Sequence, residues 1–131
     1  PHVHGLYGNR PADPSWGVAL PIITDLLSRY YGQQTVQPFV PAVHAWARFL
    51  LAMRQDGLVR YHSYGDWLEP GKVASDKLVS EMTAAFSAAE AVRIASLLGD
   101  DPHVRASFSQ EFEGMRSAFA KAYWNKTALC F

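Results

Sequence analysis

Apolar residues recur at intervals of three and four positions in four separate segments of this chain, and that spacing is typical of amphipathic α-helices. The segments span residues 17–31, 36–55, 75–99 and 102 to about 125. No stretch shows convincing strand alternation, and no motif repeats at a fixed period. The sequence therefore predicts an all-α fold.

The links between these segments predict how the helices pair. Gly32 fits the C-cap of the first helix, and Asp101-Pro102 fit the N-cap and first position of the last helix. The links at residues 32–35 and 99–101 are short, so each predicts a tight antiparallel hairpin. We therefore expect two helical hairpins.

Each helix has a predicted buried face. In the second helix, Pro41 either marks the true start or kinks the first turn, and Asp56-Gly57 ends the helix. Its predicted buried stripe is Phe39, Val40, Val43, Trp46, Ala47, Leu50 and Met53. The first helix is expected to bury Ala19, Ile22, Ile23, Leu26, Leu27 and Tyr30. The third is expected to bury Leu78, Met82, Phe86, Ala89 and Val92. The last is expected to bury Val104, Phe108, Phe112, Met115, Phe119 and Tyr123.

Charge and composition exclude several classes of protein. Lysine plus arginine and aspartate plus glutamate each number 12, which argues against a basic nucleic-acid surface and against membrane steering. The lone cysteine, Cys130, excludes a disulfide framework, and no apolar run approaches the roughly 20 residues that a membrane span needs. His2 and His4 lack a third ligand at suitable spacing, so we expect no metal site.

The length of 131 residues corresponds to one domain or to a piece of a larger one. Residues 1–15 carry three prolines and no apolar period, so they predict an extended arm. Residues 16–131 form the predicted helical-hairpin portion. Because position 1 is proline, we expect that preceding residues are missing or that a tag was removed.

An aromatic, polar loop at residues 58–72 is the strongest candidate for function, since long loops in compact domains are usually functional or disordered. It contains Asp66 beside Trp67, and such a pair can bind a sugar through ring stacking and bidentate hydrogen bonds. Alternatively, Trp67 covers the rim of the core while Asp66 caps a local turn. The segment Asp13-Pro-Ser-Trp16 has a similar pairing, with a hydrophobic staple as its alternative.

No catalytic group stands out from the local sequence. His44 lies one position from the apolar stripe of the second helix, so we expect a helix-flank histidine that bonds to a neighbour. Cys130 has no base near it in sequence and is expected to act as a small hydrophobic residue. No glycine loop with a phosphate-binding context is present.

Four motifs occur in order: Asp-Pro-Ser-Trp16-Gly, a helix ending in Arg-Tyr-Tyr-Gly32, His44-Ala-Trp-Ala-Arg-Phe-Leu, and Tyr-Gly-Asp66-Trp67-Leu-Glu-Pro. An alanine-rich helix, a Leu-Gly turn and a phenylalanine-rich helix follow. This ordered set resembles the catalytic domain of α-L-rhamnosidases over roughly residues 11–124.

The resemblance implies an α/α toroid of six helical hairpins, of which this chain would supply about two. It implies hydrolysis of terminal α-L-rhamnose with inversion and without a cofactor. Trp16 and Trp67 would line the rhamnose pocket, and Asp66 would lie beside it as a contact or a support. The family's general acid lies upstream of the matched region and its base downstream, so we assign no catalytic residue and expect the isolated chain to be inactive.

Two other interpretations stay open. The chain could be a stand-alone helical module that binds a partner helix, or part of a different α/α-toroid enzyme of the glucoamylase or trehalase type. As part of a toroid, it would have a rhamnose-containing glycoside and the rest of the catalytic domain as partners. Isolated, it is expected to self-associate because its cut surfaces are apolar.

Overall fold

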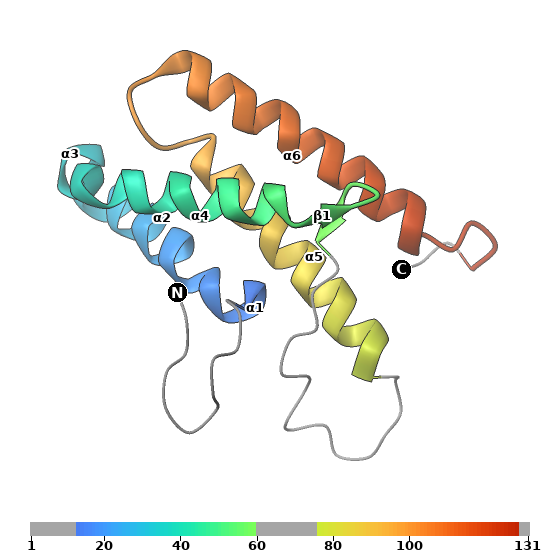
Figure 1. Cartoon of the computed structure of the whole chain (residues 1–131). Helices are drawn as coiled ribbons and strands as arrows, with labels where there is room; N and C mark the ends of the chain where they lie inside the picture. The colour runs from blue at the N-terminus through green and yellow to red at the C-terminus, as the bar shows by residue number, and fades with distance from the viewer. Residues whose placement is uncertain (1–12, 60–75, 129–131) are drawn as a thin grey trace.

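The computed structural model describes residues 13–59 and 76–128, and it confirms the all-α fold class (Figure 1). The four predicted segments correspond to the long helices α2 (Ala19–Tyr31), α4 (Val40–Ala52), α5 (Asp76–Ala95) and α6 (Pro102–Tyr123). Three short elements precede α4, namely α1 (Pro14–Gly17), α3 (Gln33–Val36) and the 3₁₀ turn η1 (Gln37–Phe39). Helix α1 takes in the last two residues of the predicted arm, because the Asp13 side chain caps it.

The helix ends follow the predicted signals at most positions. Gly32 caps α2 with a φ of 87°, and Pro41 lies in the first turn of α4, which therefore begins just before it. The Asp101 carboxylate accepts hydrogen bonds from the backbone N–H groups of His103 and Val104, at 2.8 and 3.3 Å. Pro102 then occupies the first turn of α6.

The connection after Gly32 is more than the tight link that the sequence predicts. Helix α3 and the η1 turn fill it, and α3 lies where the chain reverses between α2 and α4 (Figure 1). The Thr35 hydroxyl donates to the Tyr31 carbonyl at 2.9 Å, and the Thr35 amide donates to the Gly32 carbonyl at 3.2 Å. These local bonds explain why the chain coils here rather than turning directly.

A short β-ribbon follows α4, contrary to the expectation of no strand. Strands β1 (Arg54–Gln55) and β2 (Leu58–Val59) pair antiparallel. The two turn residues, Asp56 and Gly57, have φ values of 52° and 80°, the left-handed conformation that two-residue hairpins favour. Asp56-Gly57 thus does more than end the helix, because it reverses the chain.

The ribbon is attached to α6 by charge and by close packing. Arg54 Nη1 lies 2.7 Å from Glu111 Oε2 in an ion pair, and Arg54 Nε donates to the Leu51 carbonyl at 3.1 Å. A Cβ at Gly57 would lie 2.9 Å from the Ala118 Cβ, so the turn approaches α6 as closely as glycine allows. The segment after Val59 therefore leaves from a fixed point.

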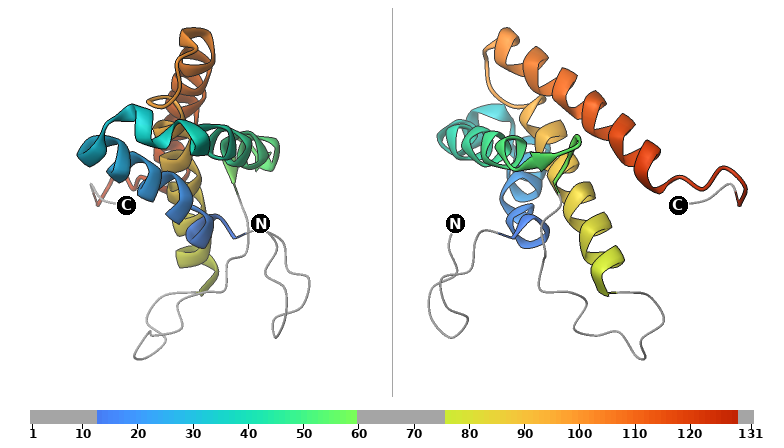
Figure 2. Two further views of the ribbon diagram at one scale, coloured as in Figure 1. Left: turned by 90° about the vertical axis from the view of Figure 1, so that its left-hand side faces the viewer. Right: turned by 45° about the vertical axis from the view of Figure 1, so that its right-hand side comes forward.

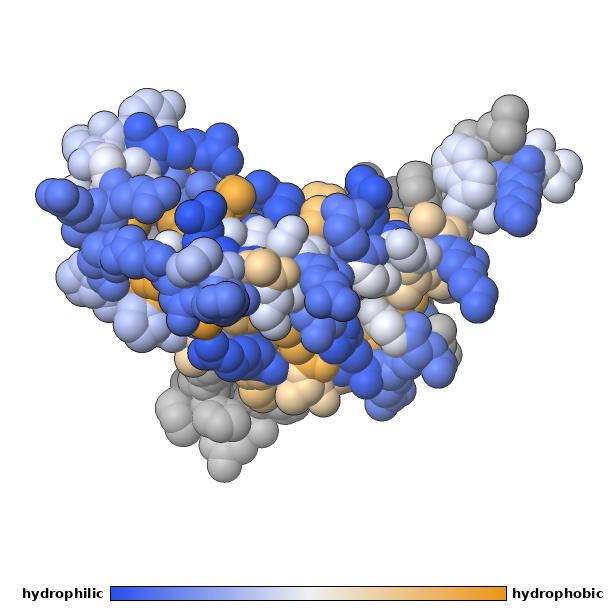
Figure 3. Space-filling model, turned by 90° about the horizontal axis from the view of Figure 1, so that it is seen from above, coloured by the Kyte–Doolittle hydropathy of each residue, from blue (hydrophilic) through white to orange (hydrophobic). Residues whose placement is uncertain are grey.

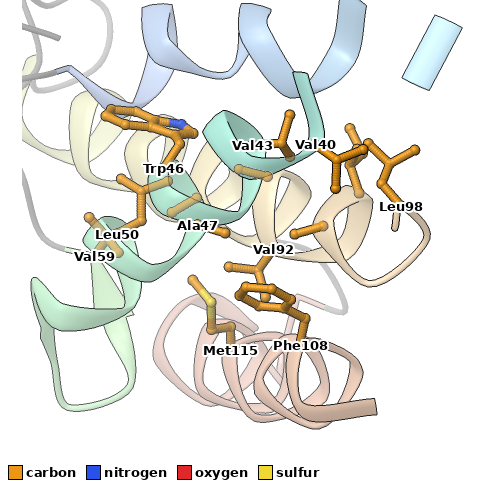
Figure 4. Packing of buried hydrophobic residues seen from close by; sticks show 14 of the residues in the cluster. Val40, Val43, Trp46, Ala47, Leu50, Val59, Val92, Leu98, Phe108 and Met115 are labelled. Carbon is orange, nitrogen blue, oxygen red and sulfur yellow. The ribbon is translucent and has the colours of Figure 1, made fainter. Parts of the chain in front are cut away.

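The core lies where α4, α5 and α6 meet, and α5 and α6 form a hairpin that α4 crosses (Figures 2 and 4). The predicted stripe of α4 is buried from Val40 to Leu50, and it includes Trp46. Small residues let α5 come close. The buried alanines of α5 are Ala84, Ala85, Ala88, Ala91 and Ala95. Phe108 and Met115 of α6 complete the cluster.

Two aromatic residues of the stripes predicted for α4 and α5 are exposed. Phe39 belongs to the η1 turn rather than to α4, so it leaves the helical register of the stripe. Phe86 of α5 is 65% exposed, because the alanine face of this helix is the one that packs inward. Hydrophobic residues also reach the surface in a band between hydrophilic ones on the face seen in Figure 3.

Helix α2 reverses the predicted burial. Pro21 and Thr24 are buried, whereas Ile23, Leu26 and Tyr30 point outward, with the Tyr30 side chain 80% exposed. The Thr24 hydroxyl donates to the Leu20 carbonyl at 2.8 Å, so the inward polar group is satisfied. The periodicity identified the apolar face correctly, and Leu27 packs against the core, but the described residues of this chain leave most of that face uncovered.

His44 bonds to its neighbours, as the sequence predicts. Its Nε2 lies 3.2 Å from the Ala95 carbonyl oxygen and 3.1 Å from that of Leu98, so it donates to the C-terminal end of α5. Its ring also contacts Phe108, at 5.1 Å between centroids. His44 therefore joins α4 to the end of α5, where carbonyls lack helical partners.

Four charged residues face one another where α2 meets α5. Asp25 pairs with Arg29 at 2.7 Å, and Glu90 pairs with Arg93 at 2.6 Å. The hydrogen bonds from Arg93 lower the pKa of Glu90, partly opposed by burial, and the charge of Arg29 adds to the lowering. The same pair raises the pKa of Arg93.

We predict that Trp46→Ala lowers the free energy of unfolding by about 3–5 kcal/mol, because the indole is buried and its loss leaves a cavity. The measurement is chemical denaturation followed by circular dichroism. Phe39→Ala is the matched aromatic control, and its exposed ring should cost less than about 1 kcal/mol. Equal losses of unfolding free energy from the two substitutions would contradict the assignment of Trp46 as buried and Phe39 as exposed.

We predict that Glu90→Gln removes an acid-sensitive part of the stability. Because the folded-state pKa of Glu90 lies below its ordinary value of 4.5, its stabilisation is complete above that pH and is lost as pH falls through the folded pKa. Denaturant midpoints at a series of pH values should therefore separate parent and variant at neutral pH and converge in acid. A constant difference at every pH would show that the carboxylate charge is not responsible.

Candidate functional site

Trp16 is the predicted site residue that the structure describes, and it lies on the outside of α1. Asp13 Oδ1 accepts from the backbone N–H groups of Ser15 at 2.7 Å and Trp16 at 3.3 Å, so the short helix has a capped start. The Trp16 side chain is 69% exposed. This exposure does not fit the staple alternative, in which the ring would pack onto the following helix.

Beside Trp16, the backbone of Gly17 lies against the ring of Trp46. A Cβ added at Gly17 would stand 2.1 Å from Trp46 Cζ2, so no side chain fits at this position without movement. Trp46 is itself 6% exposed, and its ring stacks on Phe49 at 5.4 Å between centroids. The buried Trp46 ring therefore limits how closely α1 can approach α4, while α1 packs mainly on α5.

Asp66 and Trp67, the other predicted sugar contacts, lie outside the described residues. Their assignment, and the rim alternative for Trp67, remain predictions. The structure describes where their segment begins, since β2 ends at Val59, which is buried. The ribbon and its ion pair to Glu111 fix that starting point relative to α6.

An apolar groove that the sequence analysis missed lies between α5 and α6. It has a volume of about 220 Å³ and is lined by Phe86, Ala89, Glu90, Phe112, Arg116 and Phe119. Its two charged groups are already paired, Glu90 with Arg93 and Arg116 with Glu113. Such a lining suits an apolar side chain better than a sugar, which needs several hydrogen-bonding partners. The sequence did contain a signal for this groove, because Phe112 and Phe119 are seven residues apart and so lie on the same face of α6.

Several of the described carboxylates have structural tasks. Asp13 and Asp101 cap helices, and Asp25, Glu111 and Glu113 are in ion pairs with arginines. Within residues 13–59 and 76–128, no group of three or more histidine, cysteine or acidic side chains could hold a metal ion. None of the described helices is long and apolar enough to cross a membrane.

Comparison with known proteins agrees with the motif-based resemblance. The family model of the bacterial α-L-rhamnosidase six-hairpin glycosidase domain matches residues 1–130. An α-L-rhamnosidase from Streptomyces avermitilis is 36% identical over 121 residues, which cover 91% of this chain and 11% of that protein. The chain thus spans about a tenth of the length of this relative. No solved structure matches. The helical chain described here belongs to the family of bacterial α-L-rhamnosidase six-hairpin glycosidase domains.

Proposed function

We propose that this chain is part of an inverting α-L-rhamnosidase and that it contributes sugar-binding residues to the pocket for terminal α-L-rhamnose. Family membership supports the glycosidase class, and the exposed Trp16 indole on a capped helix is the observation that carries the pocket assignment. An indole face packs on the C–H face of a pyranose and removes apolar surface of both from water. Trp67 and Asp66 complete the proposed contact set.

The proposed division of labour places acid–base catalysis elsewhere in the enzyme. Inversion needs one carboxylic acid for the leaving oxygen and one carboxylate that activates water on the opposite face. The carboxylates of Asp13, Asp101, Glu90 and Glu111 cap helices or pair with arginines, which supports a binding role for this chain. We propose no catalytic residue and no cofactor here.

The outward face of α2 supports a larger domain around this chain. Ile23, Leu26 and Tyr30 form an apolar face directed away from the described core. A helix normally buries such a face against another element. We propose that the remaining hairpins of the catalytic domain are the partner that covers it, as in a partial α/α toroid.

The same face gives specific support to one alternative function, a stand-alone helical interaction module. Such a module would present Ile23, Leu26 and Tyr30 to a partner helix. A module adapted to exist alone should stay monomeric until its partner is present, whereas a segment of a larger domain should associate through its uncovered faces. The behaviour of the isolated chain therefore separates the two functions.

We predict that Trp16→Ala and Trp67→Ala, each made in the complete enzyme, weaken rhamnose binding by about tenfold, as expected from the loss of 1–2 kcal/mol of apolar contact. The melting temperature should fall by only a few degrees. Calorimetric titration and thermal unfolding supply the two measurements. Met115→Ala, at a buried core position of α6, is the control, and it should act mainly on stability. Unchanged rhamnose affinity in both variants would refute the proposed pocket.

We predict that the isolated chain self-associates and that Ile23→Gln reduces this association, since it replaces an exposed apolar side chain with a polar one. Sedimentation velocity over a range of concentrations measures the effect. Ser109→Gln, at an exposed position of α6, is the control and should leave the association unchanged. A chain that stays monomeric at every concentration would favour the interaction module.

A further inference from the structure

The contact between Gly17 and Trp46 is too close for any other residue at position 17. A Cβ built there stands 2.1 Å from Cζ2, 2.7 Å from Cη2 and 2.8 Å from Cε2 of the indole. Real Cβ contacts essentially never fall below about 3.0 Å, so Gly17→Ala requires one of the two helices to move. Gly17 has no other feature that requires glycine, because its φ is not in the left-handed region.

The Trp46 ring is not free to withdraw from this contact. Only 6% of Trp46 is exposed. Its ring stacks on Phe49 and belongs to the buried cluster that includes Val43 and Leu50. Figure 4 shows the ring lying beside the faint blue ribbon of the N-terminal helices, on the side of α4 away from α6. Helix α1, which has only four residues, is the element that would yield.

Shape rather than hydrogen bonding accounts for the indole at position 46. Its Nε1 is buried and has no hydrogen-bond partner among the described residues. Buried tryptophans usually pair this group, so the ring is retained here despite an unpaired donor. The two ring atoms nearest to Gly17, Cζ2 and Cη2, are absent from phenylalanine, which makes Trp46→Phe a way to open space.

Movement of Gly17 is transmitted directly to Trp16. The Gly17 amide donates to the Asp13 carbonyl at 2.8 Å, and the Val18 amide donates to the Pro14 carbonyl at 3.1 Å. With the Asp13 cap, these bonds hold α1 as one turn, and its exposed large side chain is Trp16. We propose that Gly17 and Trp46 are positioning residues, whose interlocking contact sets the direction in which the Trp16 indole is presented. The link to rhamnose binding rests on the pocket function proposed above for Trp16.

The test is a double-mutant cycle with a direct readout of Trp16. The 131-residue chain is labelled with 5-fluorotryptophan, and the Trp16 fluorine resonance is assigned by its absence in Trp16→Phe. Gly17→Ala should shift that resonance by more than its linewidth and lower the melting temperature by roughly 4 °C or more. Adding Trp46→Phe to Gly17→Ala should return the resonance toward its position in Trp46→Phe alone.

Gly114→Ala is the matched control. Gly114 is also a helical glycine, but a Cβ there meets nothing within 4 Å. This substitution should leave the Trp16 resonance in place and should not lower the melting temperature, since alanine is the better helix former. It separates the clash from the general effect of adding a methyl group to a helix.

In the complete enzyme, the same variants are assayed for KM and kcat with an aryl α-L-rhamnoside, well below their melting temperatures. Gly17→Ala should raise KM toward the about tenfold loss expected for Trp16→Ala, with a smaller effect on kcat and with recovery in the double variant. A Trp16 resonance that Gly17→Ala leaves unmoved overturns the inference, whatever KM does. A resonance that moves in Gly17→Ala and returns in the double variant, with unchanged KM in Trp16→Ala, confirms the positioning and refutes the proposed pocket role instead.

Discussion

The burial of the α4 stripe against the alanine face of α5 is the constraint on which the other features depend. Because Ala88, Ala91 and Ala95 add so little bulk, α4 can approach α5 closely enough to bury Trp46. The buried indole in turn leaves no room for a side chain at Gly17, so it limits how α1, which also packs on α5, can lie. The proposed sugar contact Trp16 therefore inherits its position from the core rather than from its own packing.

Two local contacts connect this core to the surrounding parts of the structure. His44 donates to carbonyls at the end of α5, which ties the second helix of one hairpin to the first helix of the next. The β-ribbon is tied to α6 by the Arg54–Glu111 ion pair, which is partly exposed and contributes geometry more than energy. The ribbon thus fixes the described core at the point where the chain continues into its candidate binding segment.

Much of the fold could be predicted, and the errors have definite physical causes. The helices and their caps at Gly32 and Asp101 followed from local chemistry, which a sequence displays directly. The ribbon was missed because Asp56-Gly57 has two compatible roles, helix stop and type I′ turn, and flanking strands of two residues show no alternation. Phe86 was misplaced because bulky residues were weighted over the small ones that actually pack.

The sequence by itself determined the helical class, the buried stripe of α4 and, through its ordered motifs, the glycosidase family. It also identified Trp16 as a candidate contact, since a tryptophan close to an aspartate can be recognised in the sequence alone. Only the tertiary structure decided which apolar faces are covered. Burial depends on which other helices pack against a face, and the spacing of apolar residues along one helix does not show this. That is why α2 presents Ile23 and Tyr30 outward, and why the contact of Gly17 with Trp46, two residues on different helices, became apparent only in three dimensions.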